Sequence, residues 1–200
     1  MNEVGQTIGS YNKNADFYEA EADKRGIRVK DVRKAFSYLK DKKNPVVVEL
    51  GCAHGRDAQE IVKFTSNYSG MDASEKLIEK ARKKLPSFKF DVATFKEYKF
   101  PKNVDIVFAF ASLLHADKKT FKSVLKKANR ALNTGGVFFI SLQEADYKKY
   151  FKKDEMGDRM YYYYSPGDIR SMKPFSLEEV FVVQYYLRDK KWFNMILQKL

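Results

Sequence analysis

Hydrophobic residues along this chain form two kinds of pattern, short continuous runs and longer stripes at helical spacing. Short runs are typical of buried parallel strands, and stripes that repeat every three or four residues are typical of helices that cover a sheet. The runs predict strands at residues 46–50, 68–71, 88–90, 104–110 and 137–142. The stripes predict helices at residues 57–64, 75–85 and 118–132. Strands and helices that alternate in this way build a mostly parallel sheet.

The two ends of the chain depart from this alternation. Residues 7–40 carry apolar stripes at helical spacing, and Asn44-Pro45 ends that region. Residues 180–187 and 192–197 are strand-like runs joined by a short polar turn, which predicts an antiparallel hairpin. We therefore expect an α/β fold with a Rossmann-like, seven-stranded, mostly parallel sheet, an antiparallel C-terminal hairpin strand, and helices on both faces.

The chain has 200 residues, of which 44% are hydrophobic, and this is enough for one domain with a sizeable core. No repeat or linker divides it, so we expect a single domain over residues 1–200. Its expected parts are an N-terminal helical cap (1–44), a cofactor-binding core (45–142), a substrate-side segment (143–175) and the C-terminal hairpin (176–200).

The most informative stretch reads VVVELGCAHG, over residues 46–55. A strand ends in the acid Glu49, and a loop of small residues with Gly51 and Gly55 leads into a helical pattern. Asp72 stands where the second strand should end, and a carboxylate there can accept hydrogen bonds from both hydroxyls of a ribose. These features together predict a pocket for a cofactor that contains a nucleoside.

The loop does not fit a dinucleotide. The glycine pattern that brings backbone close to a pyrophosphate has Ala53 and Arg56 at its second and third glycine positions here. A phosphate-binding G-K-[ST] loop is also absent from the sequence. A cofactor with a ribose and a cationic amino-acid tail suits the loop better, because Glu49 can face an ammonium group.

Six motifs in this order resemble those of the class I S-adenosylmethionine-dependent methyltransferases. The chain is similar to the small bacterial methyltransferase-domain proteins grouped with the tellurite-resistance type, and the resemblance covers nearly all of it. The motifs are SYNKNADFY (10–18), ELGCAHGRD (49–57), GMDAS (70–74), FDVATF (90–95), VDIVFAFASLLH (104–115) and LNTGGVFFIS (132–141).

The resemblance implies an enzyme that uses S-adenosylmethionine. Tyr11 and Tyr18 would lie over the methionine end of the cofactor, and Asp91 and Val92 would meet its adenine. Ala53 stands where most members have glycine. The full set of implied cofactor-binding residues is Tyr11, Tyr18, Glu49, Gly51, Cys52, Ala53, Gly55, Asp72, Ala73, Asp91, Val92, Phe110 and Ala111.

Few side chains offer acid–base chemistry. His115, just beyond the fourth strand, is either a general base or substrate contact, or a structural histidine that closes the loop. Cys52 is either a small buried residue or a nucleophile, and Arg56 either contacts a substrate carboxylate or pairs with an acid. Tyr162 and Tyr164, in a tyrosine cluster, either contact the acceptor or pack on the core. No metal site is expected.

The chain has 38 basic and 26 acidic residues, a net charge of +12. This excess indicates a nucleic-acid partner, an acidic substrate, or a lysine-rich surface without a special role. With one cysteine and no apolar run long enough to span a bilayer, the chain is expected to be cytoplasmic. The favoured acceptor is a small molecule methylated at O, N or S. The alternatives are an RNA or protein acceptor, or a non-catalytic module that only binds ligands.

Overall fold

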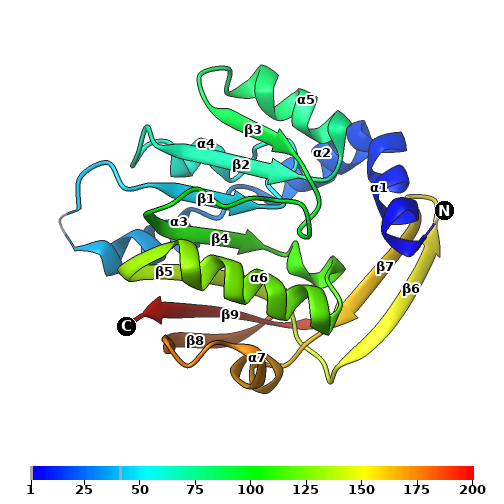
Figure 1. Ribbon diagram of the computed structural model, residues 1–200. Coiled ribbons are helices and arrows are strands. Elements are labelled where there is room, and N and C mark those ends of the chain that lie inside the picture. Colours follow the sequence, from blue (N-terminus) through cyan, green and yellow to red (C-terminus); the bar gives the residue numbers. More distant parts are fainter. Residues whose placement is uncertain (1, 41) are drawn as a thin grey trace.

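A seven-stranded sheet forms the centre of the molecule (Figure 1). The computed structural model describes residues 2–40 and 42–200. The strand order is β3-β2-β1-β4-β5-β9-β8, and only β9 runs against its neighbours. The strands of this sheet are β1 (Val47–Leu50), β2 (Tyr68–Asp72), β3 (Lys89–Val92), β4 (Val104–Phe110), β5 (Leu132–Gln143), β8 (Leu177–Leu187) and β9 (Lys190–Lys199). The predicted fold class is confirmed.

Helices cover both faces of the sheet, so that the central strands β1 and β4 are buried on both sides. All residues of β4 are buried, and they alternate between two apolar clusters, with Val107 in one and Phe108 in the other. The first cluster includes apolar residues of α6 (Lys118–Ala131) and α7 (Pro166–Met172). The second includes residues of α3 (Val29–Phe36), α4 (Ala58–Ile61) and α5 (Glu75–Lys84).

Several expected boundaries were wrong. The predicted helix at 57–64 is a helix only at α4, and turns follow it. The expected turn after α6 lies inside β5, because Val104 pairs with Leu132 while Ile106 pairs with Val137. The glycines of the turn lie at this irregularity in the register, so that the chain passes from α6 into β5 without a separate turn.

The N-terminal helices and a separate hairpin cover one end of the sheet. The helices are α1 (Glu3–Lys13) and α2 (Ala15–Arg25), and the hairpin consists of β6 (Lys148–Asp154) and β7 (Gly157–Tyr163). Side chains of α1 bond to the hairpin backbone: the Ser10 hydroxyl donates to the Asp158 carbonyl (2.8 Å), and the Met160 amide donates to the Thr7 hydroxyl (2.9 Å). We call α1, α2 and this hairpin the cap. Figure 1 shows it beside the arrowheads of the parallel strands.

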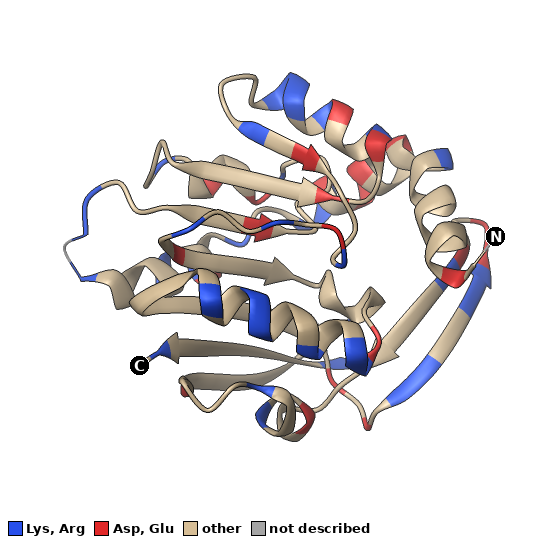
Figure 2. Cartoon of the chain, in the orientation of Figure 1, with Lys and Arg blue, Asp and Glu red and all other residues tan. Residues whose placement is uncertain are grey.

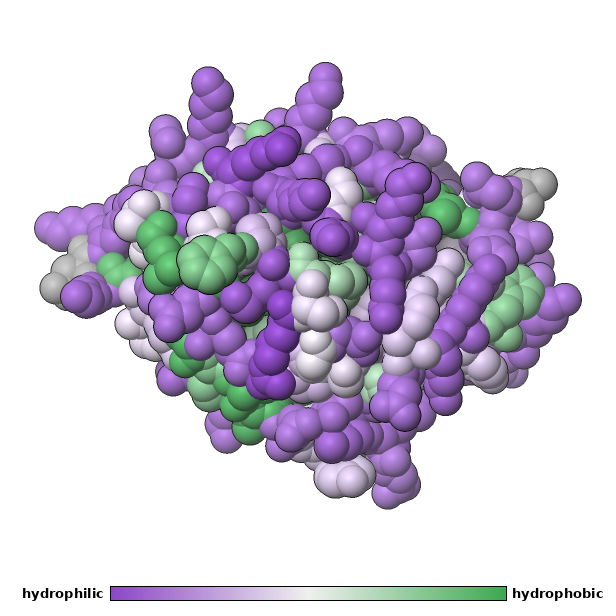
Figure 3. All heavy atoms as spheres, turned by 60° about the horizontal axis from the view of Figure 1, so that its bottom comes forward, coloured by the Kyte–Doolittle hydropathy of each residue, from purple (hydrophilic) through white to green (hydrophobic). Residues whose placement is uncertain are grey.

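The charged residues are spread over the surface. Figure 2 shows lysine and arginine on α5, α6 and β6, and acids on α5, in loops and near strand ends. The lower side of Figure 1, brought forward in Figure 3, is mostly hydrophilic and has small, separate hydrophobic patches. Among the described residues, none of the helices combines the length and apolar character that a membrane span requires.

Candidate functional site

A cavity of about 290 Å³ lies between the carboxyl ends of the central strands and the cap. One half of its wall comes from the ends of β1, β2 and β4 and the loops that follow them. The other half comes from α1, α2, β7 and the short 3-10 helix η2 (Leu113–His115). We call these two parts the strand half and the cap half. In open α/β sheets, ligands bind at this edge of the sheet.

The glycine loop begins at Gly51, where the backbone leaves β1. Gly51 has φ +73°, and a Cβ added to it would lie 2.3 Å from the Cβ of Ser112. The amides of Gly51 and Cys52 both donate to the Met71 carbonyl, at 2.7 and 3.0 Å. Only glycine fits this position, because its backbone is left-handed and packed directly against the loop after β4.

Ala53 also has a left-handed backbone, with φ +49°. An alanine in this conformation is strained by about 1–2 kcal/mol relative to the right-handed region, a penalty that glycine does not meet. This gives a physical reason for the glycine that the related motif carries here. The Ala53 amide donates to the Asp72 carboxylate, which helps to hold the loop in this conformation.

Asp72, at the end of β2, fixes the loop through both carboxylate oxygens. Its Oδ2 accepts a hydrogen bond from the Ala53 amide (3.0 Å), and its Oδ1 accepts one from the Ser74 amide (2.9 Å). Burial raises the pKa of Asp72, and these amides oppose the rise. Each oxygen keeps a second lone pair, so the carboxylate can still accept hydrogen bonds from a ligand in the cavity.

Glu49 is a buried acid in the floor of the strand half, with 2% of its surface exposed. The Tyr68 hydroxyl donates to its Oε2 at 2.6 Å. Burial, with a further contribution from the Asp57 carboxylate, raises the pKa of Glu49 to about 8. A buried carboxyl with one hydrogen-bond donor is suited to a cation, because a cation stabilises the ionised form.

Asp57 is the centre of a buried ion cluster beside this floor. The Arg28 guanidinium donates to its Oδ2 through Nη1 (2.6 Å), and Arg56 donates to the same oxygen through Nη2 (2.5 Å). Arg56 also donates to the Ala22 carbonyl of α2 at 3.1 Å. Of the two roles expected for Arg56, the structure therefore shows pairing with an acid, which ties α2 to the loop.

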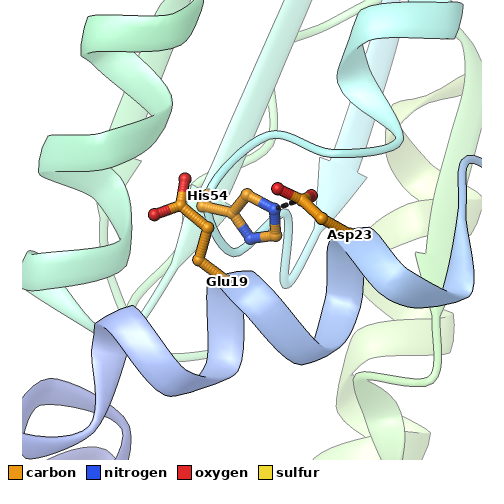
Figure 4. Close-up of side chains that lie close together, drawn as sticks. All are labelled: Glu19, Asp23 and His54. Carbon is orange, nitrogen blue, oxygen red and sulfur yellow. Dashed lines mark hydrogen bonds and ion pairs between the residues drawn. The ribbon is translucent and has the colours of Figure 1, made fainter.

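His54, in the glycine loop, lies against α2 beside two acids (Figure 4). Its Nε2 is 2.9 Å from Asp23 Oδ1, and one possible ligand atom each from Glu19, Asp23 and His54 lie within 4.8 Å of one another. This grouping was not foreseen from the sequence. Lys80 of α5 bonds to Glu19 at 2.7 Å, so the carboxylate already has a cation. The group joins α2 to the loop and to α5.

Aromatic side chains dominate the cap half. The Tyr11 hydroxyl lies 2.8 Å from His115 Nε2, and the Tyr11 and Tyr18 rings are 4.3 Å apart. His115 Nδ1 is 2.6 Å from the Met160 carbonyl, which can only accept, so Nδ1 carries the proton and Tyr11 donates to Nε2. Burial lowers the pKa of His115 to about 4, so the imidazole is neutral at pH 7.

The structure brings most of the expected site residues together around this cavity. Cys52 is among them, and burial raises the pKa of its thiol well above the usual range, which opposes a nucleophilic role. Expected residues that line the cavity are Tyr11, Tyr18, Glu49, Gly51, Cys52, Ala53, Arg56, Asp72, Ala73, Phe110, Ala111, His115 and Tyr162.

Four expected residues lie outside this lining. Gly55 has φ +76° and packs toward Ala81 of α5. The Asp91 carboxylate is 3.2 Å from the Lys89 ammonium, and Val92 is 46% exposed at the end of β3. Tyr164 is buried in the core and donates its hydroxyl to the Ala116 carbonyl at 2.6 Å, which corrects its expected contact with the acceptor.

Arg28 and Ser112 also line the cavity and were not expected there. Arg159 and Tyr161 line it as well, and they belong to the tyrosine cluster that was expected either to contact the acceptor or to pack on the core. Arg159 and Tyr161 alternate along β7, a spacing that places them on the same side of a strand. The sequence contained that signal, but not the position of β7 against α1.

The central part of the chain is similar in sequence to a known domain family. Residues 47–136 match the family model described as a methyltransferase domain. Over 103 residues the chain is 37% identical to a sterol 24-C-methyltransferase of Aspergillus fumigatus, a match that covers 46% of this chain. The chain spans only 26% of the length of that relative.

Solved structures share the whole architecture. An S-adenosylmethionine-dependent methyltransferase from Leishmania major superposes with a TM-score of 0.80 at 12% identity, covering 98% of this chain and 83% of that one. A 1,6-didemethyltoxoflavin N1-methyltransferase from Burkholderia thailandensis superposes with a TM-score of 0.72 at 14% identity, covering 96% and 87%. These findings confirm the class I methyltransferase resemblance in fold, and the family model supports it over residues 47–136. The narrower likeness to the tellurite-resistance group stays a prediction.

Proposed function

We propose that this protein transfers a methyl group from S-adenosylmethionine to a small-molecule acceptor inside the cavity. The observation that carries the proposal is the division of the cavity into a strand half with two carboxyl groups, the buried Glu49 and the half-buried Asp72, and an aromatic cap half. The relatives with methyltransferase names support the donor, and the enclosed cap half supports a small acceptor.

The residues of the strand half fit this donor. Asp72 would accept hydrogen bonds from the ribose hydroxyls, while the backbone at Gly51 leaves space for close approach. Glu49 would face the ammonium group. Its raised pKa means that the carboxyl must first release its proton, and the incoming cation would then stabilise the carboxylate. When bound, the donor supplies a methyl group on a sulfonium, which is already an activated leaving group.

The protein then needs mainly to position the acceptor and exclude water. Tyr11 and Tyr18 would enclose the reacting centre, and His115 would orient the Tyr11 hydroxyl through the bond to Nε2. A pKa of about 4 makes His115 a weak base, so its role as a base stays a prediction and its positioning role is favoured. An acceptor that arrives already ionised would need no base at all.

RNA is a second candidate acceptor, supported by the net charge of +12. Lys122, Lys126 and Arg130 line a groove between α6 and α7, and within the described part of the chain none of them forms an ion pair. Such a basic surface would bind phosphates, and its affinity would fall steeply with salt.

The test uses purified protein with S-adenosylhomocysteine, followed by a methyl-labelled donor. We expect S-adenosylhomocysteine to bind and raise the melting temperature, and the label to appear in a small molecule identified by mass spectrometry. Parallel incubation with RNA distinguishes the second candidate. No binding of S-adenosylhomocysteine at millimolar concentration, by calorimetry and by thermal shift, would contradict the proposal.

A further inference from the structure

Arg159 places a positive charge in the wall of the cap half. It lies in β7, lines the cavity and is only 2% exposed. The Tyr18 and Tyr161 rings lie 5.6 and 5.7 Å from its guanidinium carbon. The two aromatic rings therefore lie beside a buried cation in the half of the cavity that would enclose the acceptor.

Most of the hydrogen-bond donors of this guanidinium are open. Arginine has five N–H donors, and here Nη2 donates to Asp154 Oδ1 at 2.5 Å. Nη1 has only the Met156 sulfur, a weak acceptor, at 3.9 Å. Over residues 2–40 and 42–200, Nε has no hydrogen-bond partner. A buried cation with open donors is costly unless an anion completes its contacts.

The neighbouring acids do not complete them. Asp154 is shared, because its Oδ2 also pairs with the Lys152 ammonium at 2.6 Å. Glu3, another acid of the cavity wall, pairs with Lys149 at 2.6 Å. Lys152 and Arg159 share the one carboxylate of Asp154, which leaves one net positive charge. The nearby His115 is neutral and does not offset this charge.

We propose that Arg159 binds a carboxylate of the methyl acceptor, and that this acceptor is a small acid with an apolar or aromatic body. The open N–H donors match the two oxygens of a carboxylate, and the tyrosine rings match the body that carries it. This inference rests on the proposed function and names the class of its acceptor. Arg159 is then a residue that determines specificity.

The test compares two probes of the same shape, benzoate and benzamide, on protein saturated with S-adenosylhomocysteine. Ligand-observed NMR titration measures both dissociation constants. Because a hydrogen bond to a charged partner contributes about 1.5–3 kcal/mol, we expect benzoate to bind roughly ten times more tightly or better. In Arg159→Gln that preference should disappear, while the affinity for S-adenosylhomocysteine stays within about twofold.

Arg170→Gln is the matched control, since this arginine pairs with Glu179 on the surface, outside the cavity. It should keep the preference for benzoate. Equal binding of the two probes to the parent protein would overturn the inference without any variant, and would leave the donor site intact. A loss of S-adenosylhomocysteine affinity in Arg159→Gln would also overturn it, because Arg159 would then serve the donor. Failure of the parent protein to bind S-adenosylhomocysteine would instead remove the proposed function itself.

Discussion

Replacing Asp72 by alanine tests the glycine loop and the donor site together. The substitution removes the acceptor of two amide hydrogen bonds, from Ala53 and Ser74. A hydrogen bond to a charged group contributes about 1.5–3 kcal/mol. We take the lower value because the cavity lets water reach these amides, so the expected loss of stability is about 3 kcal/mol. For a chain of this length, that corresponds to a fall in melting temperature of about 6–12 °C.

The assay measures thermal unfolding and S-adenosylhomocysteine affinity in parallel. Asp72→Ala should also bind S-adenosylhomocysteine at least about tenfold more weakly, because one set of charge-assisted hydrogen bonds to the ribose is lost. Glu79→Ala is the control: this α5 acid is 42% exposed and pairs with Lys76, so its removal should change stability by less than about 1 kcal/mol.

The reasoning about Asp72 would be refuted by a variant that melts within about 2 °C of the parent and binds S-adenosylhomocysteine with unchanged affinity. A variant that is destabilised but binds normally would keep the loop argument and reject the contact with the ribose. The two readouts therefore test two separate statements about one carboxylate.

Three further predictions concern the same region. Gly51→Ala should destabilise the protein by at least about 2 kcal/mol, because a left-handed alanine is strained and its Cβ would clash with Ser112. Chemical denaturation measures the free energy of unfolding, and an unchanged value would contradict the packing at Gly51. The affinity for S-adenosylhomocysteine should rise by up to about tenfold per pH unit as pH approaches 8, because Glu49 must lose its proton to face an ammonium. Calorimetry in buffers of different ionisation enthalpy should detect the released proton at pH 7, and Glu49→Gln should abolish the release. Tyr164→Phe should cost about 1 kcal/mol through the lost bond to Ala116, with S-adenosylhomocysteine affinity unchanged; weaker binding would show that Tyr164 serves the cavity after all.

The strand half was largely predictable from the sequence. β1, β2 and β4 are short apolar runs whose ends carry the acid or small residues that a ligand site needs, and topology brings parallel strand ends to one edge. Glu49 and Asp72 were therefore expected where they lie. Their own contacts, to Tyr68 and to the loop amides, depend on distances that a sequence pattern does not contain.

The cap half was much less predictable. β6 and β7 pair mainly with each other. β6 is largely exposed and β7 is half-buried against α1, and no clear alternation of apolar and polar residues marks either strand. Tyr162 and Tyr164 are two residues apart, a spacing that places side chains on the same side of a strand. Tyr162 nevertheless lines the cavity, while Tyr164 lies just beyond β7 and is buried in the core. The position of Arg159 in the cavity wall depends on contacts between chain segments more than 130 residues apart.

The cap joins α1, from the first residues of the chain, to β7, far along it, through bonds such as that of Ser10 to Asp158. The loops of the strand half are held mainly by β1, β2 and β4, and within the cap α2 bonds to the glycine loop through His54 and Arg56. Closure between distant segments is slow to form, so a chain still folding could present the floor for the donor before the chamber for its partner exists. Changes in β6 and β7 could therefore alter which molecule is accepted while the contacts of the glycine loop stay in place.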